Sequence, residues 1–154
     1  MEYLIVKWLH ILSSTFLFGT GIGSAFYMLF TSLSRDVRAI AVVSRYVVLA
    51  DWIFTSTTVV LQPLTGLYLV HLAGYPLTST WIVASIGLYL LAGACWLPVV
   101  WMQIRMRDMA QAAARADREL PAQYWRYLRL WTVLGIPAFL ALVAVFYLMV
   151  AKPL

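Results

Sequence analysis

Apolar residues fill four long stretches of the chain, and polar residues gather between these stretches. The apolar stretches cover residues 3–30, 47–72, 81–104 and 130–150. Each is long enough to cross about 30 Å of hydrocarbon as a helix that rises 1.5 Å per residue. The pattern therefore predicts an all-α membrane protein with four transmembrane helices, in contact with the lipid bilayer.

The composition strengthens this prediction. Hydrophobic residues make up 64% of the 154 residues and charged residues 11%, whereas about a quarter of the residues in a soluble domain are charged. The length suits a single domain, residues 1–154. Short connections after the first and second stretches favour antiparallel neighbours, so the simplest arrangement is an up-down four-helix bundle.

Basic residues are distributed unevenly over the connections. The arginines follow the first stretch or lie between the third and fourth stretches: Arg35, Arg38, Arg45, Arg105, Arg107, Arg115, Arg118, Arg126 and Arg129. The opposite side carries Lys7 and Lys152. The positive-inside rule predicts cytoplasmic arginine-bearing loops and periplasmic termini, in a bacterial inner membrane. The net charge of +5 thus reflects topology, and nucleic acid is not an expected partner.

Motifs of known chemistry are scarce in the chain. A single cysteine, Cys95, excludes an intramolecular disulfide and a cysteine-clustered metal site. The sequence contains neither a glycine-rich phosphate loop nor a nucleophile elbow, so hydrolase and nucleotide-binding functions have no support. The function must then depend on polar groups inside the membrane, where an ionisable residue usually has a partner or a role.

The second stretch contains a polar stripe. Its members are separated by steps of four, three, four and three residues: Asp51, Thr55, Thr58, Gln62 and Thr65. This spacing places them on one face of a helix, and that face must turn into the bundle because lipid cannot satisfy polar groups. The stripe is interpreted either as hydrogen bonding between helices or as a proton path to a buried site.

Two further features of the second stretch give expectations about its partners. Pro63 has no amide hydrogen, so the carbonyl of Val59 should lose its usual helical partner. Asp51 lies near the predicted cytoplasmic boundary, where an ion pair with Arg45 or Arg129 is the simplest alternative to a role in a proton path.

The first stretch carries two glycines with small-xxx-small spacing, Gly19 and Gly23. Such glycines let another helix backbone approach closely, which is the favoured interpretation. The alternative is that they leave room for a flat macrocycle.

The two histidines of the chain fall on the same predicted side of the membrane. His10 lies near the outer end of the first stretch and His71 near the outer end of the second. Imidazole is a common ligand of metals and of haem iron, and facing helices of a bundle supply such ligands. The alternative is that the two histidines are unrelated, each with its own hydrogen bonds.

Several motifs carry a resemblance to known families. The signature "LADW…LQPLTGL…LVHLAGYPLT…GACWLPVVWMQIRMRDM" resembles a bacterial family of predicted four-span membrane proteins over nearly the whole chain. More distantly, the chain resembles the HemJ-type protoporphyrinogen oxidases and, through them, the CopD-like membrane proteins. "VKWLHIL" is similar to the Lys-x-x-His of the first oxidase helix, and "TTVVLQPLTGLYL" to the second. "RYLRLW" and the closing "VAKPL" resemble the corresponding oxidase segments.

The resemblance implies haem b, because the matching first-helix histidine of those oxidases is regarded as an axial ligand. That role would pass to His10. The second ligand of the oxidases is a lysine early in the third helix, where this chain has Ser85. His71 is the expected substitute, and the alternatives are a five-coordinate haem or no haem. Gly19 and Gly23 would then give the porphyrin close approach.

The resemblance also implies a redox activity, with a tetrapyrrole substrate and quinone as the electron acceptor. Arg126 and Arg129 would bind an anionic group such as a propionate, or would merely be the positive-inside signal. The second class of function is a non-enzymatic protein that handles copper or serves as an accessory subunit. Copper would be bound by Met102, Met106 and Met109, which are otherwise interpreted as packing residues. Association of several copies of the chain is left open.

Overall fold

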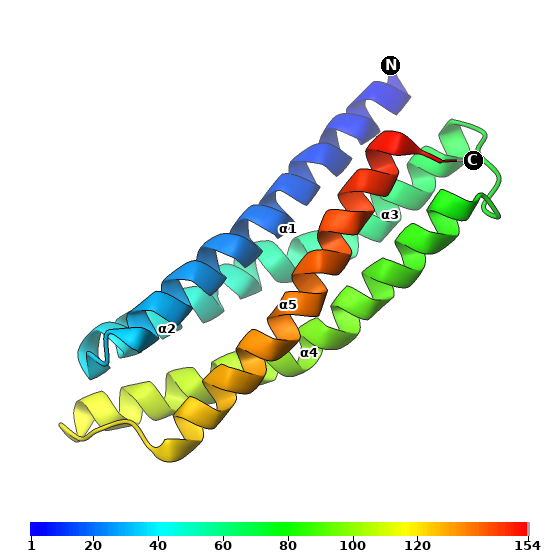
Figure 1. Cartoon of the computed structure of the whole chain (residues 1–154). Helices are drawn as coiled ribbons and strands as arrows, with labels where there is room; N and C mark the ends of the chain where they lie inside the picture. The colour runs from blue at the N-terminus through cyan, green and yellow to red at the C-terminus, as the bar shows by residue number, and fades with distance from the viewer. Residues whose placement is uncertain (154) are drawn as a thin grey trace.

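The computed structural model describes residues 1–153, and this part of the chain is helical throughout apart from short connections. The elements are α1 (Glu2–Leu33), α2 (Val37–Ala50), η1 (Asp51–Thr55), α3 (Ser56–Leu72), α4 (Thr80–Arg115) and α5 (Ala122–Ala151). The π turn η1 joins α2 to α3 without a break, since the residues on both sides of it keep right-handed helical dihedrals. Four antiparallel rods result (Figure 1). The prediction of an up-down helical bundle is confirmed.

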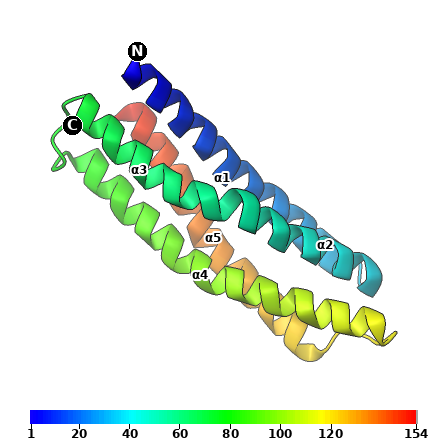
Figure 2. The same ribbon diagram turned by 180° about the vertical axis from the view of Figure 1, so that it is seen from behind.

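Both termini lie at the same end of the bundle, next to the connection between α3 and α4 (Figures 1 and 2). At this end the Tyr68 hydroxyl donates a hydrogen bond to the Glu2 carboxylate. The Lys152 ammonium lies 5.2 Å from the ring centroid of Tyr75 and 5.8 Å from that of Trp81. The termini are therefore attached to the ends of other rods.

The apolar length of the rods fits a membrane. Among residues 1–153, three helices are long and apolar enough to span it, namely α1, α4 and α5. The second rod is divided by its π turn, and α3 alone has 17 residues. Large apolar side chains are exposed along the rods, as a surface in contact with lipid requires.

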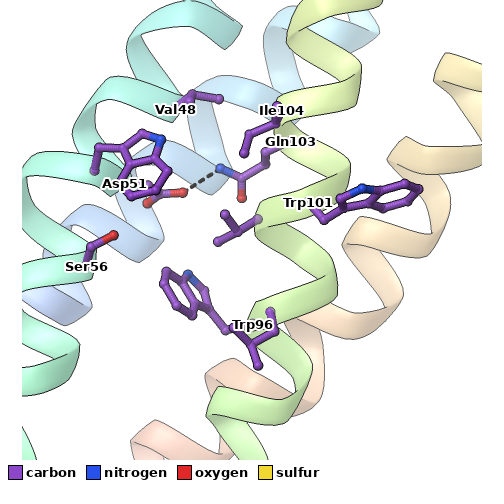
Figure 3. A pocket seen from close by; sticks show the side chains of 10 residues that line it. Val48, Asp51, Ser56, Trp96, Trp101, Gln103 and Ile104 are labelled. Atoms are coloured by element: carbon purple, nitrogen blue, oxygen red, sulfur yellow. Dashed lines mark hydrogen bonds between the residues drawn. The ribbon is translucent and has the colours of Figure 1, made fainter.

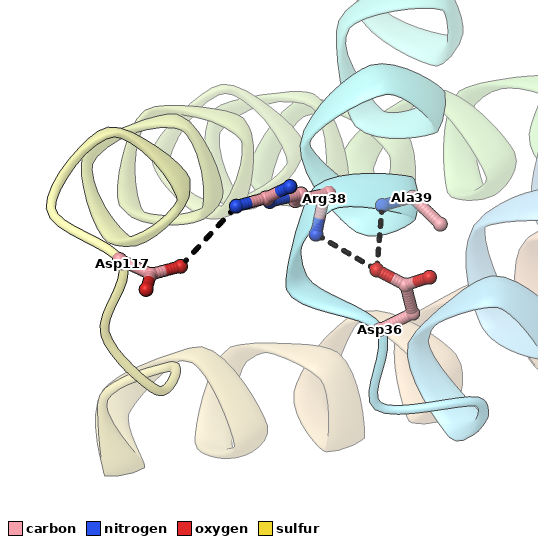
Figure 4. Close-up of polar contacts among 4 residues, drawn as sticks. All are labelled: Asp36, Arg38, Ala39 and Asp117. Carbon is pink, nitrogen blue, oxygen red and sulfur yellow. Dashed lines mark hydrogen bonds and ion pairs between the residues drawn. The ribbon is translucent and has the colours of Figure 1, made fainter.

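The helices extend beyond the predicted spans at the end opposite the termini. The second rod begins at Val37, where the Asp36 carboxylate accepts hydrogen bonds from the amides of Arg38 (3.0 Å) and Ala39 (3.1 Å) (Figure 4). The exposed Arg38 guanidinium reaches Asp117 at 3.5 Å. The helix breaks before Pro121, because α4 ends at Arg115 and α5 begins at Ala122. Seven of the nine arginines expected in loops are thus on helices, and Arg35 and Arg118 are outside them.

The tightest packing lies toward this same end. The buried core cluster consists of Met28, Ile40, Val47, Val99, Met102, Met106, Ala110, Tyr124, Leu128 and Trp131. Within it, the Ser32 and Tyr124 hydroxyls are 2.7 Å apart and join α1 to α5. The middle of the bundle is packed less tightly, and the polar groups of interest lie there.

Candidate functional site

Asp51 is a buried carboxylate in the π turn. Its side chain is 6% exposed, and Thr55 and Thr58 on the same face are similarly buried. The Thr55 hydroxyl donates to Oδ1 of Asp51 at 2.8 Å, and the side-chain amide of Gln103 on α4 donates to Oδ2 at 2.5 Å. Single π turns inside α-helices often occur at functional sites.

The network continues from Gln103 to the last helix. The Trp131 indole N–H donates to Oε1 of Gln103 at 2.9 Å. An indole N–H can only donate, so the Gln103 oxygen faces Trp131 and its amide nitrogen faces Asp51. Sequence reasoning missed both partners, although a glutamine within an apolar span is itself a signal of a buried polar contact.

The expected ion pair of Asp51 with Arg45 or Arg129 is wrong. The two ion pairs among residues 1–153 are Arg38–Asp117 and Arg107–Asp108. Asp51 turns into the bundle toward Gln103, whereas the side chains of Arg45 and Arg129 are exposed.

A cavity of about 420 Å³ adjoins this network in the middle of the bundle. All four rods line it, and its walls are mainly aliphatic and aromatic. Asp51, Gln103 and Trp131 supply polar groups, and the volume lies in the range of small-molecule sites.

Three glycines from three different helices help to create this space. Gly21 on α1, Gly93 on α4 and Gly135 on α5 all line the cavity. A Cβ atom added at any of them would meet no atom within 4 Å. Part of the cavity is therefore the space that side chains at these positions would otherwise occupy.

A second, smaller hollow of about 330 Å³ lies between the second rod and α4. Asp51, Gln103 and Trp96 line both this groove and the central cavity. Figure 3 shows Asp51 and Gln103 facing each other here, while Trp101 points away. The hydrogen-bonded Asp51–Gln103 pair thus borders both spaces.

The Val59 carbonyl, which loses its helical partner because of Pro63, accepts a hydrogen bond from another rod. The Tyr89 hydroxyl on α4 donates to the Val59 carbonyl at 2.6 Å, and Tyr89 also lines the central cavity. The sequence predicts the free carbonyl but not the residue that satisfies it, because the contact joins different rods.

The His10 side chain, on α1, packs against α3. Its Nδ1 is 2.8 Å from the Thr65 hydroxyl oxygen, and a Cβ on Gly66 would come within 3.1 Å of its Cε1. With the Gln62 amide oriented to satisfy its neighbours, its oxygen accepts from the Ser14 amide (3.2 Å). Its nitrogen then donates to the His10 carbonyl (3.2 Å) and lies 2.9 Å from Nδ1. Such amide orientations are assigned from the hydrogen-bond network.

The proton position on His10 depends on which neighbour Nδ1 contacts. The Thr65 hydroxyl donates to the Leu61 carbonyl at 2.7 Å, so its oxygen can accept a hydrogen bond from a protonated Nδ1. The ring lone pair is then on Nε2. If Gln62 donates to Nδ1 instead, the proton lies on Nε2. Only the first tautomer can bind a metal through Nε2.

The structure does not bring the two histidines together. His71 is exposed and stacks on Tyr68, with ring centroids 6.5 Å apart. Gly66 is the residue of α3 that faces His10. His71 is five residues further along α3, so it is rotated by about 140° around the helix from Gly66. Neither histidine lines the central cavity or the groove. Within residues 1–153 there is no group of three His, Cys, Asp or Glu side chains able to hold a metal ion.

Comparison with known proteins gives one result at the level of the family. A family model described as a predicted integral membrane protein, DUF2269, matches residues 4–153. The chain belongs to this family. Neither the curated proteins nor the solved structures give a match. DUF2269 membership shows a multi-pass integral membrane protein in contact with the bilayer.

In this DUF2269 chain, Gly19 and Gly23 do not pack against another rod, so that expectation is wrong. A Cβ at either would meet nothing within 4 Å. Gly19 follows the buried Leu17 by two residues, a rotation of about 200° that turns it away from the bundle. The close approach between rods occurs instead at Gly66, against His10.

Arg126 and Arg129 are exposed on α5, where neither forms an ion pair within the described part of the chain. Met102 and Met106 are buried in the core cluster and Met109 packs against it. The structure therefore assigns these methionines to packing, and it does not join them to either histidine.

Proposed function

We propose that this protein binds a lipophilic small molecule within the bilayer, in the central cavity that adjoins the Asp51–Gln103–Trp131 network. The membrane that the sequence predicts for it is the bacterial inner membrane. The observation that carries this proposal is the cavity of about 420 Å³ with apolar walls and a few polar groups. That combination is typical of small-molecule sites.

The three open glycines also favour a binding site over imperfect packing. Helix packing in membranes depends on close van der Waals contact, and small residues normally serve it. Here Gly21, Gly93 and Gly135 face empty space from three different helices. The sequence thus leaves out side chains that would fill the cavity, at a cost of about 0.5–1 kcal/mol per helical glycine relative to alanine.

Photolabelling tests this proposal. The probe is a neutral long-chain alkanol that carries a diazirine on its chain, and the protein is held in lipid nanodiscs. Labelled peptides are mapped by mass spectrometry in the wild type, in Gly93→Leu, which fills the cavity, and in Gly87→Leu. Gly87 is the matched control, because it lies on the same helix, has open space around it and does not line the cavity.

Labels on the cavity-facing parts of α1, α4 and α5 are expected in the wild type and in Gly87→Leu, and a severalfold loss in Gly93→Leu. Equal labelling of the cavity segments in all three proteins overturns the proposal. So does labelling that is confined to lipid-facing residues.

A haem b protein that passes electrons from a tetrapyrrole to quinone is the second proposal. A haem held by His10 and His71 together does not fit the arrangement described, since His10 on α1 contacts the Gly66 face of α3 whereas His71 lies on another face of α3. His10 alone retains one feature of an axial ligand, because the Thr65 hydroxyl oxygen lies 2.8 Å from its Nδ1 and could hold the ring in place. Bound there, haem would supply one-electron redox chemistry.

Absorption spectra of the purified protein, oxidised and dithionite-reduced, test the second proposal. A Soret band that His10→Ala removes and His71→Ala leaves intact is the expected result for ligation by His10. No Soret absorption in protein expressed with ample haem contradicts it. A band that both variants remove would show that α3 rotates relative to the described state.

A further inference from the structure

Asp51 is a buried acidic group for which this part of the chain supplies no cation. Its side chain is 6% exposed, and neither ion pair among residues 1–153 includes it. An ionised carboxylate in a low-dielectric interior is costly unless it is paired. The pairing group must then come from a bound molecule, or the carboxylate must take up a proton.

The hydrogen bonds around Asp51 favour the ionised form. Trp131 donates to Gln103, which fixes the Gln103 amide nitrogen as a donor to Oδ2. Thr55 donates to Oδ1. Both oxygens therefore accept hydrogen bonds from neutral groups, which suits a carboxylate with no proton of its own. These donors lower the cost of the charge without cancelling it.

The surroundings of Asp51 suit an organic cation better than a metal ion. Hard metal cations require several oxygen ligands, and residues 1–153 contain no group of three acidic, histidine or cysteine side chains that could hold a metal ion. The walls of the adjoining cavity are mainly apolar, and the indole of Trp96 lines both hollows next to Asp51 (Figure 3). Indole faces attract organic cations.

We infer that the ligand of the central cavity is an amphiphilic amine, whose apolar body fills the cavity and whose ammonium group binds the Asp51 carboxylate. This inference rests on the proposed binding function and names its ligand class. An ammonium group adds a charge-assisted hydrogen bond and replaces the missing counter-charge. A neutral alcohol of the same length can supply only a hydrogen bond.

Competition with the diazirine-bearing alkanol for the cavity tests the inference. Dodecylamine, dodecanol and dodecanoate are compared at neutral pH as unlabelled competitors, so that only the head group changes. In the wild type we expect dodecylamine to compete at least about tenfold better than dodecanol, and dodecanoate to compete worst.

Two variants separate the charge from the cavity. Asp51→Asn should remove the preference for the amine, so that dodecylamine competes no better than dodecanol. Asp51→Glu keeps the carboxylate and should retain the preference. Gly93→Leu should reduce the cavity labelling itself severalfold, with or without a competitor.

Each outcome has a distinct meaning. Equal competition by the amine and the alcohol in the wild type overturns the amine assignment but leaves the proposed cavity site standing. A preference for the amine that survives in Asp51→Asn overturns the role of Asp51. If the alkanol does not label the cavity in the wild type, the proposed function itself is overturned.

Discussion

The contact between Gly66 and His10 allows a sharp test of how α1 packs on α3. In Gly66→Ala, the new Cβ would lie 3.1 Å from Cε1 of His10, which is too close for ordinary contact. The ring cannot easily move away, because Thr65 and Gln62 both contact its Nδ1. Overpacking of this kind costs about 1–3 kcal/mol, whereas replacing a helical glycine by alanine gains about 0.5–1 kcal/mol.

Gly66→Ala should therefore lower the free energy of unfolding by about 1 kcal/mol in the wild type. In a His10→Ala background the clash is gone, so the same change should raise it by about 0.5–1 kcal/mol. The assay is equilibrium unfolding in mixed micelles at increasing sodium dodecyl sulfate fraction, followed by far-UV circular dichroism. Gly87→Ala, with nothing within 4 Å, is the control and should stabilise both backgrounds equally. Equal stabilisation by Gly66→Ala in both backgrounds would refute the packing described.

Two further predictions use the same unfolding assay. Tyr89→Phe should destabilise the protein by about 0.6–1.5 kcal/mol, because the Val59 carbonyl loses its donor. In a Pro63→Ala background the helix amide returns to this carbonyl, so the effect of Tyr89→Phe should fall toward zero. An unchanged loss of stability in that background would contradict the assignment. Asp51→Ala should lower the free energy of unfolding by about 1–3 kcal/mol, because it leaves the Gln103 amide without a buried acceptor. Asp51→Asn should lower it clearly less. Equal losses of stability in the two variants would show that the hydrogen bond contributes little.

Hydrophobic patterning was sufficient to predict the four rods, because about 30 Å of hydrocarbon imposes a minimum length on each apolar stretch. It could not predict where helices end, since a helix continues into water wherever local residues allow it. The α2 segment shows this: Asp36 caps its first turn, and the rod starts ten residues before the apolar stretch. Pro63 likewise revealed a free carbonyl, since that loss is local.

The partners of the polar groups were not predictable in the same way. Arg45 is close to Asp51 in the sequence, yet the Asp51 carboxylate accepts a hydrogen bond from Gln103 on another rod. Residues 51–55 also carry no signature of a π turn. The small-xxx-small spacing of Gly19 and Gly23 was a helix-packing signal that does not state which face of α1 turns inward. Periodicity assigns residues to faces, but long-range packing decides which face meets which rod.

The cavity raises the question of whether it is a binding site or a defect in packing, and stability and binding together can answer it. Leucine at Gly93 adds apolar contacts and removes the cost of a helical glycine, so Gly93→Leu should unfold at a higher denaturant fraction than the wild type. If the space were only a defect, nothing else would change. If the space holds a ligand, the same variant gains stability while it loses labelling. Such an opposition between stability and function is common where a site requires a structure that is not optimally packed.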